Sequence, residues 1–429
     1  MKNFFKKIVT KILIFEAKLV LKKYNPKIVA ITGSVGKTST KDAVYTVLSQ
    51  FAHVRKSDKS YNSQIGLPLT ILGIPNAWND PIKWIGNLLQ GLWLIVYPHA
   101  YPKWLVLEVG VGKPGDMAET ASWLSTDVVI LTTIPEIPAH IEFFNSRKHL
   151  VEEKATLIKT LKRSGTLILN RDNETVFELK NKTKSVVVTF GFDKEATLSG
   201  GEVNIYYENN APKGITFRVD EGGKSLPVVM EGVFGKNHVY VALAALAVAH
   251  SVNANILEAI DALRPHATPP GRMKVLAGIK DTIIIDDSYN SSPVALEAAL
   301  MTLGEIKAQR AVAVLGDMLE LGKHTEEEHK KAGKMAKEKA TILIAVGPRA
   351  QYIADGALEA GMAQGDVYTF QNSKEAAVFV YDFIAPGDVV LVKGSQGVRM
   401  ERVVSEILKD QANKAKLIVR QEDEWLKKD

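Results

Sequence analysis

The sequence contains no cysteine among its 429 residues, so disulfide bonds and thiolate metal sites are excluded. It also has no run of eighteen or more apolar residues, and we therefore expect no transmembrane helix. The basic start lacks the apolar core and small-residue cleavage site of a secretory signal. Hydrophobic residues make up 46% and charged residues 24%, as is typical of soluble globular proteins, and the length predicts two or three domains.

The excess of positive over negative charge is confined to the start of the chain. The formal net charge is +6, whereas residues 1–27 hold eight lysines and one glutamate, a net of +7, so the remaining residues sum to −1. A nucleic-acid-binding protein would need a basic face on a folded domain. We therefore expect no nucleic-acid partner.

The basic segment predicts an amphipathic helix over residues 3–24, which Asn25-Pro26 ends. Two alternatives follow for this helix and for residues 81–99, a segment rich in Trp and Leu. The helix packs on the next domain while residues 81–99 cover a sheet, or both segments make a peripheral contact with a membrane. The expected apolar face consists of Phe5, Ile8, Val9, Ile12, Phe15, Leu19 and Val20, with Lys7, Lys11, Lys18 and Lys22 on the opposite side.

Further along, apolar runs alternate with helical patterns in two blocks, which predicts an α/β protein. In the first block we expect a mostly parallel sheet, a helix over residues 146–164 and a small antiparallel sheet over residues 184–232. In the second block, strands and helices alternate after the proline-rich residues 265–270. Expected strands are residues 28–32, 103–112, 126–134 and "GTLILN" in the first block, and "DTIIIDDS", "RAVAVLGD", "ATILIAVG", "DVYTF" and "DVVLVKGS" in the second.

The first strand runs into "TGSVGKTST", two glycines, a lysine and a run of hydroxyls at the start of a helix over residues 36–50. Such a strand–loop–helix is an anion site, because backbone N–H groups and the helix dipole point at phosphate oxygens. Lys37 can reach the β- and γ-phosphates, and the Thr38 hydroxyl can bind Mg²⁺. The general phosphate-loop pattern has a further glycine where Ile31 stands, so this is the short form. An ordinary turn is the alternative.

Three further side chains follow strands of the same block. Glu108 ends an apolar strand, where a nucleotide site needs an acid for its metal; an acid facing solvent is the alternative. His140 follows the next strand, and Lys154 lies on the helix after it. A lone histidine or lysine is more often structural, so these two are candidates by position only.

Together these motifs resemble the Mur ligase family, and within it the ligases that add D-alanyl-D-alanine to a muramyl peptide. The resemblance covers roughly residues 28–405. It is carried by "TGSVGKTST", "YNSQIGLPLTIL", "LEVGVGKPGDM", "AHIEFF", "GRMKV", "IIDDSYNSSP", "AVLGDMLELGKHTEEEH" and "LVKGSQGVRMERVV".

The resemblance implies domains at residues 28–268 (a central P-loop ATP-binding domain) and 269–429 (a Rossmann-like C-terminal domain), after a helical segment at 1–27. It implies ATP and Mg²⁺ as cofactors, with two metal sites and a carbamylated Lys154. The catalytic residues would be Lys37, His140 and Lys154, and the metal would be held by Thr38, Glu108, His140 and Lys154. ATP would be bound by Gly33, Ser34, Gly36, Lys37, Thr38, Ser39, Asn170, Asp172, Arg272, Asp287 and Asn290, and substrate by Asn62, Lys393 and Arg399.

The implied reaction is ATP-dependent amide formation through an acyl phosphate. The implied substrates are a muramyl peptide and a D-Ala-D-Ala-like amine. We expect a monomer that works in the cytoplasm, either free or at the inner face of the membrane. A lipid-linked donor, a folylpolyglutamate or poly-γ-glutamate synthase, and a non-catalytic scaffold in a cell-wall complex are the alternatives.

Three departures from the family stand out. Members of the family have a domain before the phosphate loop that binds the UDP end of the substrate, and we identify no counterpart of it here. A soluble UDP-linked substrate would therefore lose a binding domain, which suggests the alternative of a lipid-linked donor. In "GKNHVYVALAA", Asn237 and His238 are transposed and Val241 replaces an asparagine, so we expect no catalytic role there. Residues 81–99 resemble an insertion.

Overall fold

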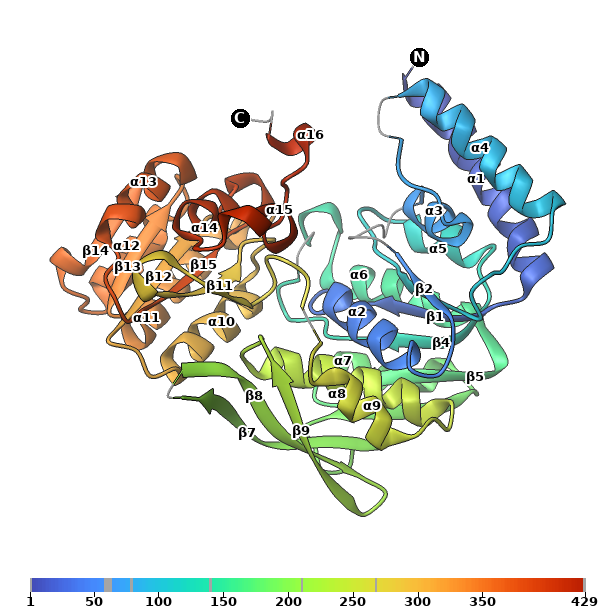
Figure 1. The fold of residues 1–429 in the computed structure, drawn as a ribbon, viewed down its shortest axis with the longest axis horizontal. Coiled ribbons are helices and arrows are strands. Elements are labelled where there is room, and N and C mark those ends of the chain that lie inside the picture. The colour runs from blue at the N-terminus through green and yellow to red at the C-terminus, as the bar shows by residue number, and fades with distance from the viewer. Residues whose placement is uncertain are drawn as a thin grey trace.

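The computed structural model describes residues 2–57, 64–77, 80–138, 141–209, 211–266 and 268–426. It contains a nine-stranded sheet and a six-stranded sheet, and the second lies at one end of the molecule (Figure 1). The α/β fold is therefore confirmed. No helix among the described residues is long and apolar enough to cross a bilayer.

The nine-stranded sheet is built from the first 231 residues. Its spatial order is β2-β3-β1-β4-β5-β6-β7-β8-β9, and neighbours are parallel from β2 to β7 and antiparallel from β7 to β9. The strands are β1 (Lys27–Thr32), β2 (Val54–Lys56), β3 (Trp104–Glu108), β4 (Thr126–Leu131), β5 (Leu161–Asn170), β6 (Val186–Gly191), β7 (Leu198–Glu208), β8 (Ala211–Glu221) and β9 (Lys224–Glu231).

The expected small antiparallel sheet over residues 184–232 is wrong in two respects. Its first strand, β6, pairs in parallel with β5, and the antiparallel strands continue the main sheet rather than forming a second one. The expected helix over residues 146–164 is also too long. It ends at Ala155, a 3₁₀ turn covers Thr156–Thr160, and β5 starts at Leu161, where Lys162 Nζ bonds Asp127 of β4 at 2.9 Å.

Helices cover both faces of this sheet. The alternation along β1 sets the layers: Val29 and Ile31 join a core with α2 and α8, and Ile28 and Ala30 join a second core with α1 and α3. The helices of this part of the chain are α1 (Lys2–Tyr24), α2 (Lys37–Leu48), α3 (Gly66–Leu72), α4 (Pro81–Val96), α5 (Asp116–Ala121), α6 (Arg147–Ala155), α7 (Glu174–Phe177), α8 (Lys236–Ser251) and α9 (Ile256–Leu263).

The predicted helix over residues 3–24 is confirmed, and the predicted apolar face is right only in part: Val9 and Val20 are buried as expected. The buried row is Val9, Leu13, Ala17 and Val20, and it packs toward α3. Three residues of the expected face are exposed instead: Ile8, Ile12 and Phe15. Residues 81–96 form α4, which packs along α1 rather than spreading over the sheet.

The six-stranded sheet has the order β10-β11-β15-β12-β13-β14, parallel except for β10. The expected alternation is confirmed, and β10 is an addition to it. The predicted boundary at 268/269 falls in the connection between α9 and β10 and stays a prediction. The elements are β10 (Lys274–Ala277), β11 (Ile283–Asp287), α10 (Pro293–Glu305), β12 (Arg310–Gly316), α11 (Thr325–Lys339), β13 (Ile342–Val346), α12 (Gln351–Glu359), β14 (Val367–Phe370), α13 (Ser373–Phe383), β15 (Asp388–Lys393), α14 (Glu401–Ile407), α15 (Lys414–Leu417) and α16 (Asp423–Leu426).

Candidate active site

The loop between β1 and α2 has the backbone of an anion cradle. Gly36, at the N-cap of α2, has φ of 84°, a left-handed conformation that suits glycine. Gly33 has φ of 141°, and a Cβ there would lie 2.0 Å from Thr132 Oγ1. Both glycines are therefore needed for the turn. The first N–H groups of α2, from Lys37 onward, have no acceptor within the helix, which leaves them to face a ligand.

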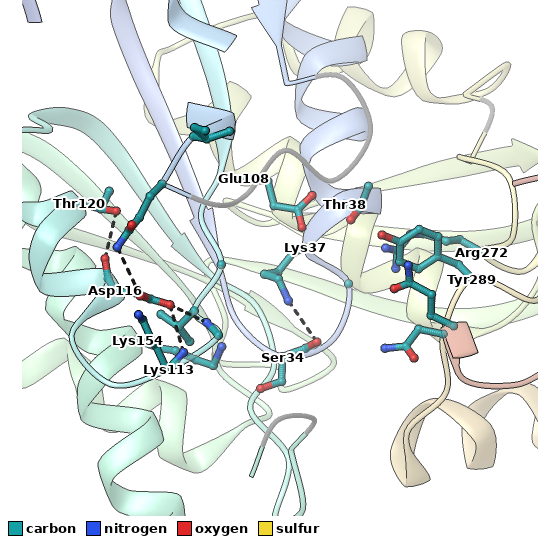
Figure 2. Close-up of a pocket in the computed structure, with 18 of the residues that line it drawn as sticks. Ser34, Lys37, Thr38, Glu108, Lys113, Asp116, Thr120, Lys154, Arg272 and Tyr289 are labelled. Carbon is teal, nitrogen blue, oxygen red and sulfur yellow. Dashed lines mark hydrogen bonds between the residues drawn. The ribbon is translucent and has the colours of Figure 1, made fainter. Parts of the chain in front are cut away.

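This loop opens into a cavity of about 580 Å³ at the carboxyl ends of the parallel strands, where α/β sheets bind ligands. Residues from both sheets line it (Figure 2). Those predicted from the sequence are Ser34, Gly36, Lys37, Thr38, Glu108, Lys154, Arg272 and Asn290, and those not predicted include Thr10, Gln64, Lys113, Asp116, Thr120, Tyr289 and Gln396.

Lys37, Thr38 and Glu108 point into the middle of this cavity (Figure 2). Lys37 Nζ donates to Ser34 O at 3.4 Å. Burial lowers the pKa of the Lys37 ammonium; nearby Glu108 raises it and Arg272 lowers it further. Glu108 ends β3 opposite Ile31 of β1 and is 1% exposed, so the alternative of an acid facing solvent is wrong.

Lys154, on α6, approaches the same loop from the other side. Its Nζ donates to Gly33 O at 2.9 Å. Burial, and next the charge of Lys37, hold the pKa of Lys154 well below its ordinary value, against the opposing effect of Glu153. The neighbouring Glu153 accepts a bond from Met117 N at 2.7 Å. Burial thus favours the neutral amine at Lys154.

The six-stranded sheet supplies the far wall. The guanidinium of Arg272 lies 4.1 Å from the ring centre of Tyr289. Figure 2 shows this pair across the cavity from Lys37. Asn290 and Gln396, after β11 and β15, complete the wall. A ligand in the cavity would therefore touch both sheets.

A second, smaller cavity adjoins the first and shares Ser34, Gly36, Arg272, Tyr289 and Asn290 with it. Asn170 lines it and donates from Nδ2 to Thr133 Oγ1 at 3.0 Å. The other predicted residues in its wall are Ser39, Asp287 and Lys393, and the transposed Asn237 and His238 also line it.

Lys393 does not present a free cation to either cavity. It is 2% exposed, and its Nζ donates to Asp287 Oδ2 at 2.5 Å and to Asn290 O at 3.0 Å. Asp287 Oδ1 also accepts a bond from Met273 N. These bonds join the carboxyl ends of β11 and β15, so the two residues fix the wall that carries Asn290.

Three predicted residues of the described chain, Gly33, Asp172 and Arg399, do not line either cavity; Gly33 contributes its carbonyl, which accepts the bond from Lys154. Arg399 is buried beside Glu401, to which its Nε donates. Asp172 accepts bonds from Phe192 N, Asp193 N and Tyr240 Oη, and only Tyr240 reaches the second cavity. Asp172 therefore positions a tyrosine instead of facing the cavity itself. Asn62 and His140 lie outside the described residues.

His238 is buried in the wall of the second cavity, close to His266. Burial lowers the pKa of His238 to about 3 and that of His266 to about 4. Thr46 Oγ1 lies 2.9 Å from His266 Nδ1. Burial therefore favours the neutral imidazole at both positions. The expectation of no catalytic role for His238 stays a prediction.

The donor set fits Mg²⁺ in the presence of a phosphate. Among the described residues no group of three histidines and carboxylates comes together that could hold a metal. Mg²⁺ usually takes one or two protein oxygens and completes its shell with waters and substrate phosphates. Thr38 and Glu108 supply a hydroxyl and a carboxylate on the same wall as the phosphate loop.

Among the residues lining the large cavity, several were quoted as parts of motifs but not singled out. Asp116 Oδ2 accepts bonds from Gly112 N at 3.0 Å and Lys113 N at 3.1 Å, and Gln64 Nε2 approaches Asp116 Oδ1 at 3.4 Å. The strings "LEVGVGKPGDM" and "YNSQIGLPLTIL" hold these residues. Both motifs were recognisable in the sequence, but only the folded structure shows that they lie together in the wall of the large cavity.

Comparisons with known proteins agree with this geometry. The family described as the Mur ligase middle domain matches residues 31–82 and 91–249, and the one described as the Mur ligase, glutamate ligase domain matches residues 271–396. Residues 1–30 precede the match, and residues 83–90, inside α4, fall in a gap of it.

Curated relatives match along most of the chain. A UDP-N-acetylmuramoyl-tripeptide–D-alanyl-D-alanine ligase of Bacillus subtilis (strain 168) is 27% identical over 396 residues, covering 91% of this chain and 78% of the relative. The Escherichia coli (strain K12) ligase of the same name is 28% identical, covering 88% and 76%.

Among solved structures, the MurF ligase of Thermotoga maritima in complex with ADP superposes with a TM-score of 0.76 at 25% identity, covering 92% of this chain and 83% of that one.

Proposed function

The chain belongs to the Mur ligase family of ATP-dependent amide ligases of peptidoglycan synthesis, and from that premise we propose that it joins D-alanyl-D-alanine, or a similar amine, to the carboxylate of a muramyl peptide. The observation that carries the proposal is the cavity in which Lys37, Thr38 and Glu108 meet Arg272 and Asn290 of the second sheet. The names of the curated relatives and of the ADP-bound structure support the same substrates.

The proposed reaction has two steps. The donor carboxylate attacks the γ-phosphorus of ATP, the bond to the β-phosphate oxygen breaks, and ADP leaves behind an acyl phosphate. The amine nitrogen then attacks the acyl carbon, inorganic phosphate leaves with the electron pair of the broken C–O bond, and the nitrogen loses a proton to give the amide.

Both reactants of the first step are anions, so the site must offset their repulsion. Lys37 and the first N–H groups of α2 would bind the phosphates, and Arg272 lies across the cavity from them. Thr38 and Glu108 would hold Mg²⁺, which stabilises charge on phosphoryl oxygens when bound. The second cavity, with Asn170 and Ser39, adjoins the phosphate loop and would take the nucleoside.

Lys154 has a separate proposed role. A neutral amine reacts with carbon dioxide, whereas an ammonium does not, and burial favours the neutral form here. We therefore keep carbamylation of Lys154, which would turn the side chain into a metal-side carboxylate, as part of the proposal. Intact-mass measurement of the native protein in bicarbonate, with Lys154→Ala as control, tests it: the wild type should gain about 44 Da and the variant should not.

The reaction is tested by phosphate release with purified protein, ATP and Mg²⁺. Release should require both a muramyl tripeptide and D-Ala-D-Ala, and mass spectrometry should find the pentapeptide product. Release that requires a folate and glutamate instead would assign the protein to the folylpolyglutamate alternative. Absence of release with every donor and amine would favour the scaffold alternative.

A further inference from the structure

The helices α1 and α4 lie side by side and project beyond the nine-stranded sheet (Figure 1). They run parallel, because Lys23 near the end of α1 bonds the last carbonyls of α4. Its Nζ reaches Leu94 O at 3.2 Å, Ile95 O at 2.8 Å and Tyr97 O at 2.7 Å. Further toward the N-termini, Glu16 packs against Gly91, where a Cβ would lie 2.3 Å from a carboxylate oxygen. The two helices therefore form one unit, the α1–α4 pair.

The outer face of the α1–α4 pair is apolar. Helical periodicity places the exposed apolar row of α4 opposite the row that it buries, and that of α1 between its buried row and its lysines. On α1 the buried row is centred on Leu13, and on α4 the buried residues are Trp84, Asn87 and Gly91. The outer rows are Ile8, Ile12 and Phe15 of α1 and Ile82, Ile85, Leu89, Leu92, Trp93 and Val96 of α4, each between 38% and 81% exposed.

An exposed apolar surface of this extent marks an interaction site. Its charges indicate the partner. Lys11, Lys18 and Lys22 are exposed and follow one another on α1 directly beside the row of Phe15. The acid of α1, Glu16, is buried against α4, and the residues of α4 include none. Apolar rows with a lysine edge are complementary to a bilayer that carries anionic lipids.

A second copy of the chain fits this face less well. Symmetric contact would bring the lysine edges of two α1 helices together, and the one acid of each pair, Glu16, is buried and cannot offset them. Trp93 lies at the end of α4 beside Tyr97 and His99, and its Nε1 donates to His99 at 3.1 Å. Aromatic side chains with a polar atom are typical of the bilayer interface.

We propose that the outer face of the α1–α4 pair docks on the surface of an anionic bilayer and so holds the large cavity next to the membrane. Thr10 of α1 lines that cavity from the side of the helix opposite Ile8 and Ile12, so one helix diameter, roughly 10 Å, separates the cavity wall from the docking face. The docked enzyme would receive a donor that is anchored in the membrane by a lipid. This consequence for the substrate rests on the proposed ligase function; the docking itself does not.

Docking is tested with the full chain and vesicles, in the absence of nucleotide and substrate. The protein should float with vesicles of phosphatidylglycerol and phosphatidylcholine, bind pure phosphatidylcholine weakly, and lose affinity as salt is added. Because no ligand of the cavity is present, the result stands whether or not the ligase assay succeeds.

Leu89→Ser combined with Leu92→Ser should reduce vesicle partition at least about tenfold. The matched control is Val378→Ser with Tyr381→Ser, which removes two exposed apolar residues of α13. It should bind like the wild type. Both variants should keep the wild-type melting temperature, since all four side chains are exposed.

Lys11→Gln with Lys18→Gln should remove most of the salt dependence. Equal loss in the α13 control, or absence of binding to every vesicle, would overturn the proposal. A dimer that the Leu89/Leu92 variant abolishes, without vesicle binding by the wild type, would assign the face to a second copy and overturn it as well.

Discussion

The wall of the large cavity and the outer face of the α1–α4 pair depart from the usual pattern of burial in opposite directions. In the cavity wall, polar groups are buried: Glu108 and Lys154 are 1% and 3% exposed. On the α1–α4 pair, apolar groups are exposed, with Phe15 at 62% and Leu89 at 61%. Polar groups are usually exposed and apolar side chains usually buried, so buried polar groups and exposed apolar patches are informative exceptions. Each therefore marks a surface selected for something other than stability.

The two regions also differ in their relation to the family. The cavity wall falls almost entirely within the matched residues, whereas α1 and residues 83–90 of α4 lie outside them. The family match therefore covers the cavity wall but not α1 or the middle of α4. Substitutions should separate the two.

The largest expected effect is that of Lys37→Ala in the cavity wall. Removing a cation that faces the phosphates should lower kcat by about 10³-fold or more. Steady-state phosphate release measures it, and Lys159→Ala, an exposed lysine after α6, is the control. Vesicle binding should stay unchanged. Turnover within a few-fold of wild type would show that Lys37 does not serve the phosphates.

Glu108→Gln should have the next largest effect. The amide keeps the shape of the side chain but loses the charge that would hold Mg²⁺ and that raises the pKa of Lys37. We expect kcat to fall by about 10²-fold and the Mg²⁺ concentration for half-maximal rate to rise. A titration of rate against Mg²⁺ measures both. An unaltered Mg²⁺ dependence would contradict the assigned metal role.

Leu13→Ala and Phe15→Ala compare the two sides of α1. Leu13 is fully buried, and its truncation should cost about 3 kcal/mol of unfolding free energy, because it leaves a cavity toward α3. Phe15 is exposed, so its truncation should change the stability by less than about 0.5 kcal/mol while weakening vesicle binding. Urea denaturation measures the stabilities. Equal costs for the two would mean that Phe15 is covered in solution.

The effect expected of Glu16→Gln is on stability alone, and it depends on pH. Burial between the helices raises the pKa of Glu16 from 4.5 to about 7. The folded protein therefore holds this proton more tightly than the unfolded chain, and its stability falls as pH rises from about 4.5 through about 7.

The variant has no such group to ionise, so its melting temperature should exceed that of wild type by a few degrees at pH 8 and match it near pH 4.5. Thermal unfolding at both pH values checks this. Glu406→Gln, at an exposed glutamate on α14, should show no difference at either pH. A wild-type melting temperature for Glu16→Gln at pH 8 would contradict the burial of a charged carboxylate.

The sequence predicted the elements that follow from continuous apolar runs. The strand at residues 28–32, the loop after it and the five strands of the second block are where the pattern placed them, because strands buried on both faces read the same in any parallel sheet. The direction of β6 was not predictable, because alternation along a strand is identical in parallel and antiparallel sheets.

The apolar face of α1 was not predictable for a different reason. The helix carries two apolar rows, and only the positions of α3 and α4 decide that Leu13 is buried and Phe15 is not. The same holds for the cavity wall. Its loop residues were recognisable by type and spacing, but the ion pair between Lys393 and Asp287 depends on β11 and β15 being neighbours, which the chain order does not reveal.

The direct connection between α1 and the phosphate loop has a mechanical consequence. Two residues separate the end of α1 from β1, and β1 is a strand of six residues, about 20 Å long, that ends at Thr32, directly before Gly33 of the phosphate loop. No flexible tether intervenes, so a docked enzyme would hold its phosphate loop at a fixed height above the lipid headgroups. The enzyme would then select donors by the distance between their lipid and their reactive carboxylate, because only a donor of matching length would bring that carboxylate to the phosphate loop.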